Sequence, residues 1–469
     1  MNSDEAQVQN TSRFEKIEIG ENPSRASSVV FFVVCLVPVL STVLYGGVDS
    51  GTWVAISVLT GVLALAWLTD AWFGNGFLVN RSLLLLPLGA MIVIGVIQLI
   101  PVFSSGLPPE LLAVQDTQPL SMDPYSTRFF IIRLVAYFLF FAAALTFVNT
   151  ERRLKRLTML VIVLGSLTAF FGILQWLAKP AAIYGLRETP GAVSFGPFVN
   201  QHHFAAFIEL CGGLAFGLLA GGAVKRDKML VIGIGALMMV SAALLTGSRG
   251  GFLSFAGMAA FILVARLKTG TKNHDATVGS PPMKTLSVVM AIVVGIICVI
   301  GIVMFVGGDT ALIRGSGIKQ AATDVSNGRT HFWMTAIKIF LDRPIFGVGY
   351  DAFGVAFPKY DTWNGVFRIE QAHNDYLQTL ADAGIAGFLC VLGFIYLLFK
   401  KGFAVIGSTT DPFRSSIAVG ALAGCCGILI HSFFDFPLRT PVNAFLFLLM
   451  AAAATVVVKP ADKVARKRR

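Results

Sequence analysis

The sequence predicts an all-α integral membrane protein, a polytopic bundle of about 12 transmembrane helices, and three observations support this prediction. The chain has 469 residues, of which 55% are hydrophobic and only 13% are charged. Its mean hydropathy of +0.74 lies far above that of a soluble domain. The apolar residues come in blocks of about 18–24, each long enough to cross a hydrocarbon core of about 30 Å as a helix, and not in the short alternating segments of an outer-membrane barrel.

Each apolar block is expected to form one membrane span. The expected spans are Ser28–Tyr45, Thr52–Thr69, Ser82–Phe103, Phe129–Val148, Leu154–Ala178, Phe204–Ala223, Met229–Thr246, Phe252–Ala265, Thr285–Val306, Tyr376–Phe399, Ser416–Phe433 and Val442–Val458. They divide the chain into a disordered cytoplasmic leader (1–27), transmembrane helices 1–9 (28–306), one long and partly helical periplasmic loop (307–375), transmembrane helices 10–12 (376–458) and a basic cytoplasmic tail (459–469).

The net charge of +11 could indicate a nucleic-acid partner, but Lys and Arg also mark the cytoplasmic loops of membrane proteins. The positions of the basic residues favour the second explanation. The basic clusters fall on one side of the predicted topology, at 152–156, 225–228, 266–284, 400–414 and in the KVARKRR tail. Both termini are therefore expected in the cytoplasm, and no nucleic acid is expected to bind.

The long loop at 307–375 is expected to fold and to carry function, because its composition is not that of a disordered segment. Within it, NGRTHFWMTAIKIFLDRP predicts a helix that ends before Pro344. The expected apolar stripe of this helix is Phe332, Trp333, Ala336, Ile337 and Phe340. The glycines of the following IFGVGYDAFGVAF predict a turn that passes close to other backbone, after which the loop returns to His373.

His373 is the first candidate for chemistry, at the mouth of the tenth expected span. Asn374 and Asp375 follow it and are expected to cap that helix. An imidazole, with an ordinary pKa near 6.5, is well suited to take a proton from a hydroxyl near neutral pH. A histidine at a helix start can also serve merely as a hydrogen-bonding residue, and the neighbourhood of His373 decides in favour of function.

That neighbourhood contains several arginines on the same predicted outer face. Arg187 lies in the loop GLRETPGAVSFGPFVNQHH, Arg249 in the turn TGSRGG, and Arg133 about one turn inside the fourth expected span. An arginine at membrane depth is costly unless it is paired, so it marks a functional site by default. Because one guanidinium group can bind two phosphate oxygens at once, these residues predict a phosphate-bearing ligand.

Further polar pairs lie at the ends of other spans. His431 and Asp435 are four residues apart and would share a helix face as a polar pair if the helix persists. The neighbours His202 and His203 could suggest a metal, but no Cys or carboxylate cluster accompanies them. The chain also has no Asp-X-Asp pair and no Walker-type phosphate loop. No metal and no cofactor is therefore expected, and the predicted donor is a lipid-linked phosphate.

The segment HNDYLQTLADAGIAG resembles the O-antigen ligase and polymerase superfamily, WaaL and Wzy, which are membrane enzymes of the GT-C type. The shared pattern is His-Asn, nine residues, then Gly-X-X-Gly, here His373, Asn374, Gly384 and Gly387. TGSRGG, NGRTHFW, RPIFGVG, GPFVNQHHFA and HSFFDFPL also resemble segments of this superfamily. The chain departs from this superfamily at one point. The ligase pattern has Arg, three residues, then Leu, whereas here Arg329 is followed at that spacing by Trp333.

The resemblance implies transfer of an undecaprenyl-diphosphate-linked polysaccharide to a hydroxyl of lipid A-core, on the periplasmic face of the bacterial inner membrane and without metal or nucleotide. His373 would match the catalytic histidine, and Arg249 an arginine that holds the donor diphosphate. Arg187, Arg133 and Arg329 are further candidates for the diphosphate, and Gly384 and Gly387 are expected to serve close helix packing.

Three alternatives stay open beside the ligase. A polymerase of the same superfamily would join repeat units on undecaprenyl carriers, and a protein O-oligosaccharyltransferase would use a protein acceptor. From another class, a twelve-span transporter fits the same topology, since fold does not fix function. The polar residues gather at one face and not at mid-bilayer, and this favours an enzyme over a transporter.

Overall fold

The structure is a computed structural model, and it describes residues 24–74, 76–104, 117–190, 192–270, 328–363 and 369–458. The helices are α2 (Arg25–Val43), α3 (Ser50–Phe73), α4 (Leu85–Gln98), α5 (Pro124–Phe147), α6 (Glu151–Ala178), α7 (Gln201–Ala220), α8 (Arg226–Leu245), α9 (Arg249–Gly270), α11 (Arg329–Asp342), α12 (Phe353–Tyr360), α13 (Asp375–Ser408), α14 (Pro412–His431) and α15 (Pro441–Thr455). Two 3-10 turns, η1 (Tyr45–Gly47) and η3 (Pro437–Arg439), and two antiparallel hairpins, β1 (Pro101–Ser104) with β2 (Thr117–Pro119) and β3 (Ala182–Ile183) with β4 (Arg187–Glu188), connect them.

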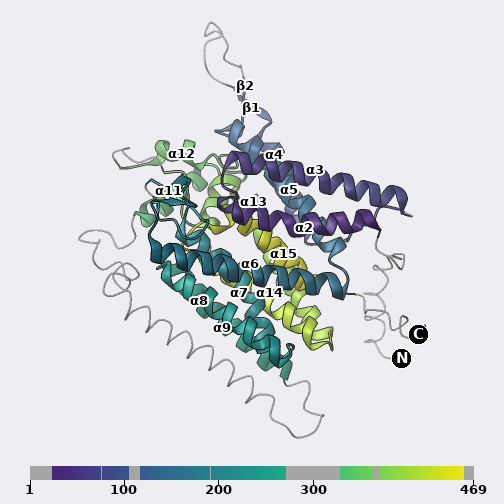
Figure 1. Ribbon diagram of the computed structural model, residues 1–469. Helices are drawn as coiled ribbons and strands as arrows, with labels where there is room; N and C mark the ends of the chain where they lie inside the picture. Colours follow the sequence, from purple (N-terminus) through teal and green to yellow (C-terminus); the bar gives the residue numbers. More distant parts are fainter. Residues whose placement is uncertain are drawn as a thin grey trace.

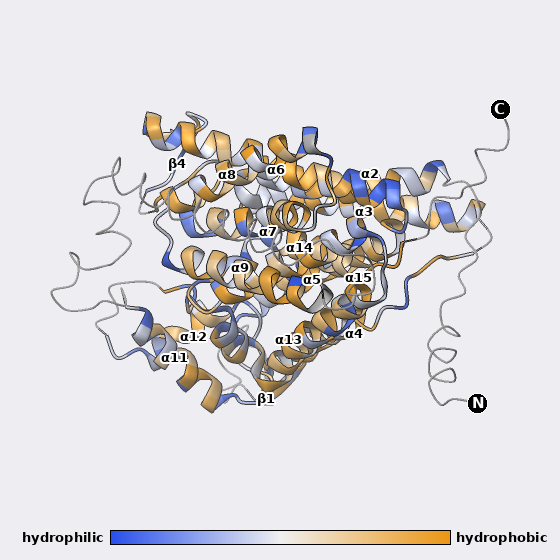
Figure 2. Ribbon diagram, turned by 90° about the horizontal axis from the view of Figure 1, so that it is seen from below, coloured by the Kyte–Doolittle hydropathy of each residue, from blue (hydrophilic) through white to orange (hydrophobic). Residues whose placement is uncertain are grey.

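The prediction of a polytopic helical membrane protein is confirmed. Nine helices in the described part are long and apolar enough to cross a membrane, and α4 and α15 are shorter apolar helices. Every expected span except Thr285–Val306 coincides with a helix, and that one lies outside the described residues, as do most of the leader and the whole basic tail. Hydrophobic residues colour most of each long helix in Figure 2.

The third expected span is shorter than predicted. It was expected to run to Phe103, but α4 ends at Gln98 and the chain continues as strand β1 from Pro101. A proline lacks the backbone N–H of a helix and disfavours helical geometry in the residue before it, so Pro101 does not extend α4 and instead begins the strand.

Helices α7 and α14 form the centre of the bundle and cross at a contact between glycines. Gly213 and Gly217 on α7 face Gly420 and Gly424 on α14 at the spacing of two small-xxx-small motifs. A Cβ on Gly213 would lie 2.6 Å from the carbonyl oxygen of Gly420. This close backbone approach fixes the two helix ends that carry His202, His203 and His431.

The long helices present two different ends. At one end Arg153 donates to the carbonyl of Phe147, and Arg414 donates to the carbonyl of Val456. The opposite end holds α11 and α12, which lie at the left of Figure 1, and the start of α13, on which they pack. Arg153 and Arg414 thus lie at the opposite end of the bundle from His373.

Gly384 breaks the geometry of α13, and its role differs from the helix packing expected for it. Its φ of +61 is left-handed, and the turn at Pro344–Gly349 packs into the break. Ile385 N donates to the carbonyl of Pro344 (2.8 Å), and Gly349 N donates to the carbonyl of Asp382 (3.0 Å). The glycine therefore admits a turn from the preceding loop, which confirms the predicted close approach of the RPIFGVG segment to other backbone.

The helix predicted in the long loop is present as α11. Pro344 follows its end, as expected, and Phe332 and Ala336 are buried as predicted. The buried face differs from the predicted stripe at two positions. Ile337, which belongs to the predicted stripe, is exposed, and Ile339, which does not, is buried. The helix packs on α13 and α12, and its contact face is set by these partners as well as by its own periodicity.

Candidate functional site

Asn374 positions His373 at the start of α13. Its side-chain oxygen accepts from the backbone N–H groups of Tyr376 and Leu377, both at 3.0 Å, which confirms the predicted cap. His373, the residue before the cap, has a φ of +52. Non-glycine residues adopt this left-handed conformation rarely, and such strain gathers at functional positions.

The turn after α14 is bound to the start of α13. Asp375 N donates to the carbonyl of Ser432 (2.9 Å), and the Ser432 hydroxyl donates to the Asp375 carboxylate (2.9 Å). Asn374 Nδ2 donates to the carbonyl of Phe433 (3.1 Å), and Leu438 N donates to Asp375 (3.2 Å). Asp375 thus holds the HSFFDFPL segment against HND, in addition to starting the helix.

Asp435 in this turn is the partner of His373. Its Oδ1 lies 3.1 Å from His373 Nδ1 and accepts from Phe436 N at 2.9 Å. Its Oδ2 lies 3.7 Å from an Nη of Arg329, the first residue of α11. The structure therefore brings together His373, Asp435 and Arg329, three residues from three separate parts of the sequence.

The electrostatics of this trio favour a charged carboxylate. The Asp435 side chain is only 2% exposed, and burial opposes ionisation, but the hydrogen bond with His373 holds the Asp435 pKa well below its usual range. A carboxylate at Nδ1 leaves Nε2 of His373 as the nitrogen that can accept a proton. The His373 side chain is 32% exposed, so a substrate hydroxyl can approach it.

The expected pair of His431 and Asp435 is wrong. Helix α14 ends at His431, so the two side chains do not share a helix face. The His431 ring instead turns into the bundle, where its Nδ1 lies 2.8 Å from Oε1 of Glu209 on α7. Both side chains are at most 1% exposed. Sequence reasoning missed Glu209, although an ionisable residue inside a membrane span is itself a signal.

A buried polar chain leads from this pair to the start of α9. The Ser248 hydroxyl lies 3.4 Å from His431 Nε2 and 2.9 Å from His202 Nδ1, and it also accepts from Gly251 N at 3.2 Å. Ser248 therefore caps the helix that begins with Arg249, a half-buried residue. This chain connects the start of α9 to α7 and α14.

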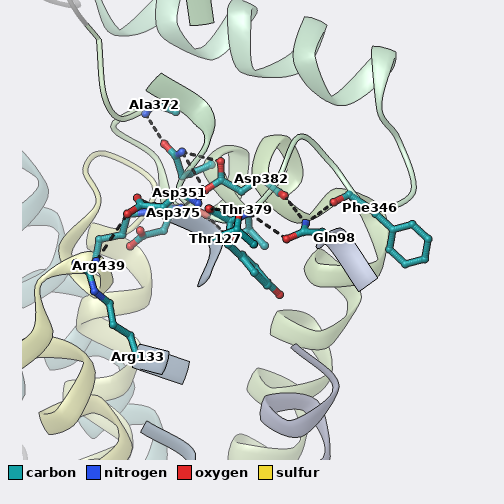
Figure 3. Close-up of polar contacts among 12 residues, drawn as sticks. Gln98, Thr127, Arg133, Phe346, Asp351, Ala372, Asp375, Thr379, Asp382 and Arg439 are labelled. Carbon is teal, nitrogen blue, oxygen red and sulfur yellow. Dashed lines mark hydrogen bonds and ion pairs between the residues drawn. The ribbon is translucent and has the colours of Figure 1, made fainter. Parts of the chain in front are cut away.

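Arg439 is the centre of a second network, which the sequence did not reveal. Its guanidinium bonds Asp351 at 2.8 Å and also pairs with Asp382 on α13, while Arg133 lies 3.7 Å from Asp351 (Figure 3). Opposite charges around the buried Arg439 hold its pKa above the usual value although burial opposes this. Arg133 thus lies beside an ion-pair network at the same end as His373.

Gln98 extends this network to α4. Its Nε2 donates to the carbonyls of Phe346 (2.6 Å) and Asp382 (2.8 Å), and its Oε1 accepts from Tyr350 N at 3.0 Å. These contacts appear at the right of Figure 3. The turn after α11, the break in α13 and the turn before α15 are therefore held as one unit.

Arg187 and the neighbouring histidines have partners of their own. Arg187 on β4 pairs with Asp49. Its guanidinium carbon also lies over the Tyr45 ring, 4.8 Å from the ring centre. His202 contacts Ser248, whereas His203 Nδ1 lies 2.7 Å from the Thr440 hydroxyl, so the two rings diverge. Among the described residues no group of three or more His, Cys, Asp or Glu side chains is placed to hold a metal ion.

Comparisons with known proteins agree with the predicted resemblance. A family model described as O-antigen ligase matches residues 234–392, which include Arg249, Arg329 and His373. The chain is 25% identical over 287 residues to the exopolysaccharide production protein ExoQ of Rhizobium meliloti (strain 1021), a match that covers 59% of this chain and 61% of that protein. The chain thus matches less than two thirds of the length of this curated relative.

Proposed function

We propose that this chain, whose residues 234–392 carry the O-antigen ligase family match, transfers a glycan from undecaprenyl diphosphate to an acceptor hydroxyl. The observation that carries the proposal is the His373–Asp435 contact, with Arg329 on the other carboxylate oxygen. The positive-inside prediction assigns this end of the bundle to the periplasm of a bacterial inner membrane. The donor and acceptor would then both reach the site from the outer leaflet.

The proposed reaction is a single displacement at the anomeric carbon of the donor sugar. The acceptor oxygen forms a bond to that carbon, the bond from carbon to phosphate oxygen breaks, and the diphosphate leaves with the electron pair. Nε2 of His373 takes the acceptor proton, and Asp435 stabilises the resulting imidazolium. General-base assistance of this kind contributes about 10²–10⁴-fold.

Arginines at the same end would stabilise the charge that develops on the leaving diphosphate. Arg329 is the first candidate because it already lies beside Asp435, with its side chain 26% exposed. Arg249 is the second, because the polar chain through Ser248 places the start of α9 next to His431 and His202. We assign a smaller share to Arg187, which pairs with Asp49, and to Arg133, which lies over Trp53 near Asp351.

The acceptor distinguishes two members of this class. Ligation to lipid A-core is our first proposal, on the strength of the O-antigen ligase match. A polymerase that extends a chain still carried on undecaprenyl diphosphate is the second, and the printed name of the relative, an exopolysaccharide production protein, favours it. Both use the same donor chemistry.

The test is complementation of a deletion strain with the wild-type chain, His373→Ala or the control Lys359→Ala. Lys359 is an exposed residue that pairs with Asp342 and Tyr360, away from the trio. We expect the control to restore surface glycan and His373→Ala to fail although it reaches the membrane at the wild-type level. Transfer by His373→Ala at the wild-type rate would refute the assignment.

Gel analysis of the glycolipids then identifies the acceptor. Loss of a ligase leaves long chains on undecaprenyl and bare lipid A-core, whereas loss of a polymerase leaves a single repeat unit on core or removes exopolysaccharide from the medium. Unchanged surface glycan together with reduced uptake of a solute would instead support a transporter.

A further inference from the structure

Trp363 is an exposed aromatic residue beside the trio. It follows α12, and 47% of its surface is accessible. Its ring stacks on the ring of His331 from α11, with centroids 4.1 Å apart and planes at 7°. One face of the indole is therefore covered by a flat, well-matched partner while much of the side chain remains open.

The aromatic pair is held rigidly. Oδ1 of Asp361 lies 2.6 Å from His331 Nε2 and accepts from Trp363 N at 2.9 Å, so a single carboxylate positions both partners. The side chains of His331 and Asp361 are only 14% and 9% exposed. An aromatic ring that is fixed before binding loses little conformational entropy when a ligand stacks on it.

The pair also lies close to the reactive residues. A Cβ on Gly328 would lie 2.9 Å from the edge of the Trp363 indole, so Trp363 reaches the residue that precedes Arg329. The Phe332 ring bridges the remaining distance, with its centroid 5.9 Å from that of Trp363 and 6.0 Å from that of His373. Two linked sugar rings would cover this separation.

We propose that Trp363, supported by His331, is a stacking subsite for a sugar ring of the glycan that reacts at His373. The negative face of an aromatic ring attracts the C–H groups that line one face of a pyranose, and stacking tolerates different hydroxyl patterns. The subsite deepens the proposed function, on which it rests, by assigning the residue that holds the glycan away from the anomeric carbon. Either the donor glycan or the acceptor glycan has the required chemistry.

The direct test is saturation-transfer NMR on the full-length protein in detergent. The probe is an oligosaccharide released by mild acid from the surface polysaccharide of the source strain. We expect the oligosaccharide to bind the wild type, Trp363→Phe and His373→Ala. We expect binding at least about tenfold weaker to Trp363→Ala and to Trp363→Leu. The leucine variant keeps an apolar side chain but has no ring. Tyr125→Ala is the matched control, an exposed aromatic at the start of α5.

Undiminished binding to a folded Trp363→Leu protein would overturn the subsite. Because His373→Ala is expected to bind the oligosaccharide without transferring it, the subsite and the proposed reaction can be refuted separately.

Steady-state kinetics of the Trp363 variants then distinguish whether the bound glycan belongs to the donor or to the acceptor. An increased KM for the acceptor with unchanged kcat assigns the acceptor to Trp363, an increased KM for the lipid-linked donor assigns the donor, and a loss of kcat alone would contradict a binding role.

Discussion

Nδ1 of His373 lies 3.1 Å from Oδ1 of Asp435, although 62 positions separate the two residues in the sequence. The contact exists because Asn374 and Asp375 bind the turn after α14 through their side chains. The same carboxylate approaches Arg329 through its second oxygen. One buried acid thus connects a predicted base to a predicted phosphate-binding arginine.

Asp435→Asn is expected to reduce transfer by about 10²–10⁴-fold with little change in KM. The amide keeps the size of the carboxylate, but it does not stabilise an imidazolium and can hold the imidazole in the wrong tautomer. The measurement is the transfer rate of the purified variant with lipid-linked donor. Asp342→Asn is the control, because Asp342 bonds Lys359 and Tyr360 at an exposed position. Equal rates for both variants would show that Asp435 has no part in the reaction.

The lowered pKa of Asp435 predicts an acid-sensitive fold. In the unfolded chain this carboxyl titrates near its ordinary value of about 3.9, so below that pH the unfolded state binds a proton that the folded state does not. Its contribution to stability is therefore complete above about pH 5 and declines as the pH falls further. Thermal unfolding in detergent should show a steeper loss between pH 5 and pH 3 for the wild type than for Asp435→Asn. Parallel curves would contradict this coupling.

The helices were predictable because each apolar block has the length of a membrane span. The end of α4 shows the limit of that signal, since hydropathy continues past Gln98 although Pro101 prevents a helix. His373 and its cap were also predictable, because Asn374 is a local signal for a helix start.

The partners of the site residues were not predictable in the same way. A spacing of four suggested that His431 pairs with Asp435, but where α14 stops is decided by contacts of the turn with α13. Glu209 and Arg439 belong to networks whose other members lie on distant helices, so no short segment of sequence displays them together.

Gly384→Ala is expected to disrupt the break in α13. A Cβ at this left-handed position would meet the backbone of Ile345 and is unfavourable at the φ of +61. We expect a loss of about 1–3 kcal/mol in stability and reduced transfer, because the displaced turn carries Asp351 away from Arg439.

The matched control for this substitution is Gly393→Ala in the same helix. Its Cβ would have only an ordinary contact, 3.9 Å from Pro87 Cγ. Alanine is favoured over glycine in a helix interior, so this variant should be neutral or slightly stabilised in thermal unfolding. The hypothesis fails where the two alanine variants melt at the same temperature.

Removing His431 alone should destabilise the protein more than removing Glu209 and His431 together. His431→Leu leaves the fully buried Glu209 without its 2.8 Å partner, and loss of one member of a buried pair costs about 3–5 kcal/mol. The double variant Glu209→Leu with His431→Leu removes the stranded acid, and well-packed apolar replacements of buried pairs are often close to neutral. Thermal unfolding of the single and double variants measures this difference, and additive losses would show that the two residues are not coupled. A transfer defect that persists in the stable double variant would show that the Glu209–His431 pair, which contacts Ser248 through His431, positions the start of α9.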